Sequence, residues 1–233
     1  MKILSLETSS PVLSVALKNE TNPVRQKTCE GYREHVENML VLIHSLLQDE
    51  RLSLKEIDTF LIGRGPGSFT GLRVGFATLK GFLAYEKRNC YGALSLDMIA
   101  AGIDAEEGSF LGICLDARRG KIYSRFYERK KDAWQAVSEP GVLLPEEVAS
   151  RLPQESHLAG DALLKFRHEF ERDPGRKKIH FLPESCWYPS AAQMISCFLN
   201  DGRHDLLKPL TEPKDFVPLY FRLSEAEERK QPL

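Results

Sequence analysis

Hydrophobic and polar positions follow two periodicities along this chain, and their order repeats once. Short β-rich runs with alternating burial signals precede segments with a helical period near 3.6. In the first half we predict strands over Lys2–Thr8, Val12–Lys18, Val24–Cys29, Asp58–Gly63 and Tyr91–Leu94, and helices over Arg33–Asp49, over Leu72–Ala84 and from Ser95 onward.

The second half of the chain repeats this order. Here the pattern predicts strands over Phe110–Asp116, Lys121–Tyr127, near Val142, over His157–Gly160 and over Lys178–Leu182, with helices from Pro145, from Ala162 and over Pro189–Asn200. Two such halves predict a duplicated α/β fold, in which each lobe is a mixed sheet carrying helices. We expect residues 1–106 to form the N-terminal lobe and residues 107–233 the C-terminal lobe and tail.

A glycine-rich loop at 63–75 separates a predicted buried strand from a predicted helix. It has neither the Lys-Ser/Thr pair of a P-loop nor the G-x-G-x-x-G spacing, so two interpretations stay open. The free N–H groups at the helix N-terminus offer an anion site, while the glycines also suit a tight packing hinge in which Ser68 caps the helix. The loop positions that matter are Gly65, Gly67, Ser68, Thr70 and Gly71.

Several motifs together resemble one known family. They are the glycine-rich run 63–75, the opening strand Ile3–Ser9, the segment Leu115–Tyr123, the short Ala159–Ala162 and the tail Pro218–Arg222, in that order. This set resembles the TsaB (YeaZ) family, the partner subunits of bacterial tRNA threonylcarbamoyladenosine synthase. The match extends over nearly the whole chain.

The resemblance implies an actin-like ATPase (ribonuclease-H-like) fold and a non-catalytic role. Such a subunit binds and activates a TsaD-like catalytic subunit, which attaches threonylcarbamoyl to N6 of adenosine 37 in tRNAs reading codons that begin with A. A TsaE-like ATPase completes the assembly, tRNA is held mainly through the partner, and the chain alone forms a homodimer. The rival interpretations are a stand-alone ATP-dependent kinase or ATPase of the actin-like superfamily and, less favoured, a peptidase.

The first hairpin turn is where actin-like enzymes hold phosphate. In this chain Thr8, Ser9 and Ser10, preceded by Glu7, are the candidates for a degenerate phosphate loop, and Pro11 removes one backbone donor. In the catalytic TsaD paralogue a His-x-x-x-His pair binds the metal. The resemblance places Ser95 and Ile99 at those two positions. We therefore expect no catalytic residue, no bound metal and no cofactor.

The predicted helix Arg33–Asp49 carries two apolar stripes, and one stripe suffices for a core. We assign the stripe Val36, Leu40, Ile43 and Leu47 to the core of the lobe. The resemblance implies pairing through N-lobe helices, so the second stripe is the predicted partner interface: His35, Met39, Leu42 and Leu46.

Net charge, cysteine spacing and the lengths of the apolar runs each exclude some classes of protein. A formal net charge of −1 provides no global field for a polyanion, so any contact with RNA must be local or made by another subunit. Five widely spaced cysteines indicate neither a disulfide framework nor a zinc knuckle. With no signal-peptide pattern and no membrane-length apolar run, we expect a cytoplasmic protein.

Overall fold

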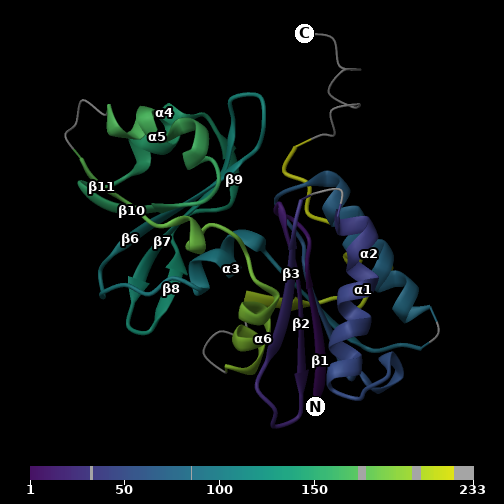
Figure 1. Ribbon diagram of the computed structural model, residues 1–233. Helices are drawn as coiled ribbons and strands as arrows, with labels where there is room; N and C mark the ends of the chain where they lie inside the picture. Colours follow the sequence, from purple (N-terminus) through teal and green to yellow (C-terminus); the bar gives the residue numbers. More distant parts are fainter. Residues whose placement is uncertain (32–33, 85, 173–176, 201–205, 223–233) are drawn as a thin grey trace. The chain divides into compact units, whose positions relative to one another are not determined.

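The computed structural model describes residues 1–31, 34–84, 86–172, 177–200 and 206–222 (Figure 1). Two compact units divide them. Residues 1–102 with 188–218 form the first unit, and residues 103–187 with the segment after 218 form the second. No described helix is long and apolar enough to cross a membrane.

The first unit is built on a six-stranded mixed sheet of order β12-β5-β4-β1-β2-β3. β2 runs antiparallel to both of its neighbours, whereas β1, β4 and β5 are parallel to one another. The strands are β1 (Lys2–Glu7), β2 (Val12–Asn19), β3 (Arg25–Glu30), β4 (Thr59–Gly63), β5 (Asn89–Ala93) and β12 (Leu207–Pro209).

Helices cover both faces of this sheet (Figure 1). Alternation along β1 sends Leu4 and Leu6 toward α1 (Glu34–Asp49) and α2 (Phe69–Leu83), while Ile3 points to the other face. That second face is covered by α3 (Ser95–Ala101) and α6 (Ala191–Leu199). Burial on both faces explains why these strands read as near-continuous apolar runs.

The second unit repeats the strand order of the first. Its sheet runs β11-β10-β6-β7-β8, with β7 antiparallel to its neighbours and β9 paired to β7. Its elements are β6 (Phe110–Asp116), β7 (Ile122–Lys130), β8 (Ala133–Ala136), β9 (Gly141–Leu143), α4 (Pro145–Arg151), β10 (Glu155–Ala159), α5 (Leu163–Glu171) and β11 (Lys178–Phe181). The duplicated mixed sheet confirms the predicted two-lobed, actin-like α/β fold.

The predicted lobe limits need correction at the C-terminal end. We expected all residues from 107 onward in the second lobe, but residues 188–218 pack with the first unit. The reason is that this segment supplies a helix and a strand to the first sheet. Met194 and Ile195 of α6 are fully buried against β1, β2 and β4, and β12 extends the first sheet by pairing with β5.

Candidate functional site

The turn between β1 and β2, predicted as a degenerate phosphate loop, is buried. Glu7, Thr8, Ser9 and Ser10 are each at most 4% exposed. The Glu7 carboxylate accepts a hydrogen bond from the Ser9 backbone N–H at 2.7 Å and one from the Ser95 hydroxyl at 3.1 Å. Burial raises the pKa of Glu7 above its ordinary value of 4.5, although these hydrogen bonds act in the opposite direction.

The glycine-rich loop fills the space against this turn. The Ser68 backbone N–H donates to the Ser9 carbonyl at 2.7 Å, and the Ser95 N–H donates to the Gly65 carbonyl at 2.8 Å. A Cβ on Gly67 would lie 2.1 Å from the Ser9 carbonyl oxygen. Because that neighbour is backbone, it cannot move aside, and only glycine fits.

Two further glycines make the same close approach to side chains of the turn. A Cβ on Gly63 would lie 2.0 Å from a carboxylate oxygen of Glu7, and one on Gly75 would lie 2.6 Å from the Thr8 hydroxyl. Of the two interpretations of the loop, the structure therefore favours the packing hinge. Its glycines let β4 and α2 press onto the first hairpin turn.

The start of α2 is satisfied within the chain itself. Ser68 is the N-cap, and its hydroxyl accepts from the Gly71 N–H at 3.1 Å, which confirms the predicted capping role. The helix begins at Phe69, three residues earlier than predicted, because this cap stabilises the first turn. Thr70 is exposed and Gly71 is buried.

The hydroxyl groups of the predicted phosphate loop do not point to an accessible site. Ser10 Oγ donates to the Val12 carbonyl at 3.0 Å and accepts from the Val12 N–H at 3.2 Å. The hydroxyls of Thr8 and Ser9 are buried and have no hydrogen-bond partner among the described residues. A phosphate could reach them only if the glycine-rich loop moved.

The two positions that correspond to the metal pair of the paralogue serve the core. Ser95 is fully buried and donates to Glu7, and Ile99 is 2% exposed. An isoleucine side chain offers no metal ligand. Among the residues that the structure describes, no group of three or more His, Cys, Asp or Glu side chains is placed to hold a metal ion.

The corresponding turn of the second unit, between β6 and β7, is open. Arg118, Arg119 and Gly120 are exposed and adopt left-handed backbone conformations, with φ of 64°, 52° and 73°. Asp116 at the start of the turn accepts from the Arg118 N–H at 2.9 Å and pairs with Lys165 at 2.6 Å.

Three motifs that carry the family resemblance meet at this second turn. Asp161, from the Ala159–Ala162 motif, accepts from the Asp116 N–H at 2.8 Å, and burial raises its pKa above 3.8. Arg222, from the C-terminal motif, donates to the carbonyls of Ala117 and Arg118. These motifs are far apart in the sequence, but their residues contact one another at one turn of the second unit.

The predicted partner stripe on α1 is wrong at Met39 and Leu46. Met39 and Leu46 are each 1% exposed and belong to the core against the sheet, and Leu42 is partly buried beside them. Leu40, assigned to the core stripe, is 58% exposed. The side chains of His35 and Val36 lie outside the described residues.

The error has a geometric cause. The arc that faces β2 and β3 is centred on Met39, Ile43 and Leu46, between the two stripes, so both contribute to one core face. Apolar periodicity alone does not give the centre of so wide an arc. The exposed apolar side chains that the sequence reasoning missed are Leu40 and Val41, at 58% and 59%, on the face that also carries exposed Glu37 and His44.

Comparison with known proteins gives consistent results. The family model described as "TsaD: tRNA N6-adenosine threonylcarbamoyltransferase" matches residues 29–191, well over half of the chain. The chain is 33% identical over 157 residues to the tRNA threonylcarbamoyladenosine biosynthesis protein TsaB of Escherichia coli, covering 66% of this chain and 67% of that protein. It is 31% identical over 148 residues to the TsaB protein of Bacillus subtilis, covering 63% and 64%.

Solved structures agree with the sequence relatives. YeaZ from Pseudomonas aeruginosa superposes with a TM-score of 0.76 at 25% identity, covering 94% of this chain and 99% of that one. The chain therefore belongs to the family described by the TsaD model and, within it, to the TsaB (YeaZ) proteins of tRNA threonylcarbamoyladenosine biosynthesis.

Proposed function

We propose that this chain is a non-catalytic subunit of a tRNA threonylcarbamoyladenosine synthase, which binds a TsaD-like catalytic subunit and supports its activity. The observation that carries the proposal is the sealed first turn. The glycine-rich loop fills it, Ser95 and Ile99 are used in the core, and the unpartnered hydroxyls of Thr8 and Ser9 are buried out of reach of a phosphate. This arrangement speaks against the rival ATP-dependent kinase.

The exposed side of α1 is the proposed docking face. Leu40 and Val41 are large apolar side chains that the described part of the monomer leaves in solvent. On the neighbouring α2, Ala77 and Gly81 are also exposed, and a Cβ on Gly81 would meet no atom within 4 Å. Small side chains beside large apolar ones let a partner helix approach closely. We propose that the same face also joins two copies of the chain when the partner is missing.

The remaining members of the assembly follow from the family. A TsaE-like ATPase is the source of nucleotide turnover in this proposal, and tRNA is held mainly through the catalytic subunit, since this chain has a net charge of −1. Because tRNA is the object of the modification, we place the chain in the cytoplasm.

Reconstitution with a TsaD-like subunit tests the docking face. Leu40→Glu and Val41→Glu each place a carboxylate in the proposed interface at an exposed position, so stability should change by only about 0.5 kcal/mol. Binding should weaken by roughly tenfold or more, and threonylcarbamoyl transfer by the mixture should fall with it. Leu164→Glu on α5 is the matched control, because Leu164 is 67% exposed in the second unit.

Leu46→Glu provides a contrast in the same helix. Leu46 is buried, so an unpaired carboxylate there should unfold the first unit rather than abolish docking selectively. Normal binding by folded Leu40→Glu and Val41→Glu variants would reject this docking face. Transfer of threonylcarbamoyl to tRNA by the chain alone would reject the non-catalytic role itself.

A further inference from the structure

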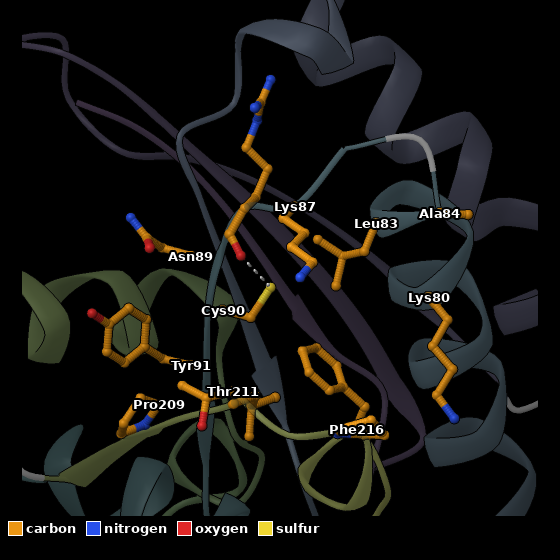
Figure 2. A pocket seen from close by; sticks show the side chains of 13 residues that line it. Lys80, Leu83, Ala84, Lys87, Asn89, Cys90, Tyr91, Pro209, Thr211 and Phe216 are labelled. Carbon is orange, nitrogen blue, oxygen red and sulfur yellow. Dashed lines mark hydrogen bonds between the residues drawn. The ribbon is translucent and has the colours of Figure 1, made fainter.

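A cavity of about 660 Å³ opens in the first unit beside the C-terminal end of α2 (Figure 2). Its walls come from the end of α2, from Lys87 and Arg88 before β5, from β5 itself, and from the end of β12 with the segment that follows it. A volume of this size is typical of small-molecule sites, which range from about 300 to 1,000 Å³. Neither the hairpin turn nor the docking face proposed above contributes a lining residue.

The interior of the cavity is mostly apolar. Leu83, Cys90, Tyr91, Leu210 and Phe216 line it, and Figure 2 shows the side chains of Leu83, Cys90 and Phe216 pointing toward a common space. Burial raises the pKa of the Cys90 thiol to about 12, so this group is neutral and contributes no charge. Such walls suit an aromatic or branched aliphatic body.

The charged groups of the lining all have one sign. Lys80, Lys87 and Arg88 line the cavity, and none of its described lining residues is an aspartate or a glutamate. Arg88 is already committed, because it donates to the carbonyls of Ile57 and Lys55 and pairs with Glu86.

The two lysines have no ion-pair partner among the described residues. Asp58 lies in an adjoining hollow that Lys87 and Arg88 also line, and it accepts from the Lys2 backbone N–H at 2.7 Å but forms no described ion pair with either lysine. Lys80 and Lys87 thus give the lining two positive charges that no described ion pair engages, which favours an anion.

The walls are held by internal hydrogen bonds. The Leu210 N–H donates to the Cys90 carbonyl at 2.8 Å, which fixes the end of β12 on β5. Asp215 accepts from the N–H groups of Thr211 and Glu212 at 3.2 and 2.8 Å and so closes the turn that presents Phe216. A preformed wall lowers the ordering cost of binding.

We propose that this cavity binds a small amphiphilic anion. Its aromatic or branched body would lie against Leu83, Cys90 and Phe216, and its single negatively charged head group would lie at the rim of the cavity that carries Lys80 and Lys87. The inference concerns the isolated chain and does not depend on the proposed role in the synthase.

A matched pair of fluorescent probes tests the proposal on the full chain. The first is 8-anilinonaphthalene-1-sulfonate, and the second is its neutral parent 1-anilinonaphthalene, which has the same rings without the charge. We expect saturable one-to-one binding of the sulfonate. The double variant Lys80→Gln/Lys87→Gln should weaken it about tenfold and leave the neutral probe within about twofold, since only the charged head meets the lysines.

Further variants and competitors locate the site. Lys121→Gln makes the same charge change at an exposed position of the second unit and should have no effect. Phe216→Ala should weaken both probes, because it removes part of the apolar wall. Phenylacetate and phenyl phosphate should displace the sulfonate, whereas benzyl alcohol should not, and the stronger of the two anions identifies the head group.

Three results would overturn the proposal. The first is the absence of saturable binding, and the second is sulfonate affinity that survives the double lysine variant. The third is an equal loss for the charged and the neutral probe, which would mean that the lysines support the fold of the wall and do not recognise charge.

Discussion

The first hairpin turns of the two units occupy the same place in a repeated fold and have opposite surroundings. In the first unit Glu7–Ser10 is buried under the glycine-rich loop of its own chain. In the second unit Ala117–Gly120 is mostly exposed, Arg118 pairs with Asp116, and Arg222 donates to the Arg118 carbonyl. The turn of the first unit is part of a buried core, and the turn of the second unit is a surface loop.

Both turns nevertheless depend on one glycine next to a backbone carbonyl. A Cβ on Gly67 would lie 2.1 Å from the Ser9 oxygen, and one on Gly160 would lie 2.1 Å from the Cys114 oxygen. The two turns therefore share the close contact between a glycine and a backbone carbonyl. They differ in whether a loop of the same chain covers the turn.

The largest expected effect on stability comes from replacing a glycine that packs against backbone, compared with a glycine that has free space around it. Gly67→Ala should cost roughly 3 kcal/mol or more, because the new methyl group collides with backbone. Gly120→Ala should cost about 1 kcal/mol, because φ is 73° but nothing lies within 4 Å of the new Cβ. Urea unfolding measures both.

Two optical probes assign these effects to a unit. Both tryptophans, Trp134 and Trp187, lie in the second unit, so their fluorescence reports that unit while circular dichroism reports the whole chain. In Gly67→Ala the unfolding transition seen by circular dichroism should begin at a lower urea concentration than the transition seen by tryptophan fluorescence. Equal costs for the two glycine variants would contradict the contrast between a sealed and an open turn.

The next effect concerns the buried carboxyl of the sealed turn. Because the pKa of Glu7 is raised in the folded state, the folded chain binds the proton more tightly than the unfolded chain does. The contribution of Glu7 to stability should therefore be fully present below the ordinary pKa of 4.5 and fall as pH rises toward the folded pKa, by at most about 1.4 kcal/mol per pH unit. Glu7→Gln should remove this fall.

Unfolding free energies of wild type and Glu7→Gln at several pH values between 4.5 and 8 provide the measurement. The glutamine keeps an acceptor for the Ser9 N–H and a polar group for Ser95, so the variant should be at least as stable as wild type at neutral pH. A large loss of stability at neutral pH would indicate that an ionised Glu7 supports the turn.

The smallest effect should come from the open turn. Lys165→Gln removes the ion pair with Asp116, but the lysine side chain is 50% exposed and solvent screens the pair. We expect a change of about 0.5 kcal/mol in urea unfolding, and less at high salt. A loss above 2 kcal/mol would show that the second turn is as tightly integrated as the first.

Much of this architecture could be predicted from the sequence. Apolar runs bounded by turns gave the strands and the duplication, and the motifs gave the family, which the comparisons confirm. The path of the last residues could not be predicted, because α6 has the same amphipathic pattern whichever unit it covers. β8 was missed because Ala133–Ala136 is only four residues long and carries one large apolar side chain, Trp134, which is too little to show an alternating pattern.

The candidate site was predicted only in part. The glycines and the Ser68 cap follow from local chemistry, which a motif reveals. The prediction of a docking stripe on α1 failed because the apolar arc of this helix is wide. Its periodicity does not show which part of the arc contacts the sheet. Nor could the cavity be foreseen, since its walls come from segments more than 100 residues apart.

Binding of Mg²⁺·ATP to the isolated chain tests the central claim most directly. A chain whose first turn is sealed should show no saturable rise in melting temperature and no hydrolysis above background at millimolar nucleotide. A saturable rise, equivalent to about 2.7 kcal/mol at a hundredfold excess over Kd, would contradict the account. Turnover of about 1 to 1,000 per second would do the same, and would favour the kinase or ATPase alternative.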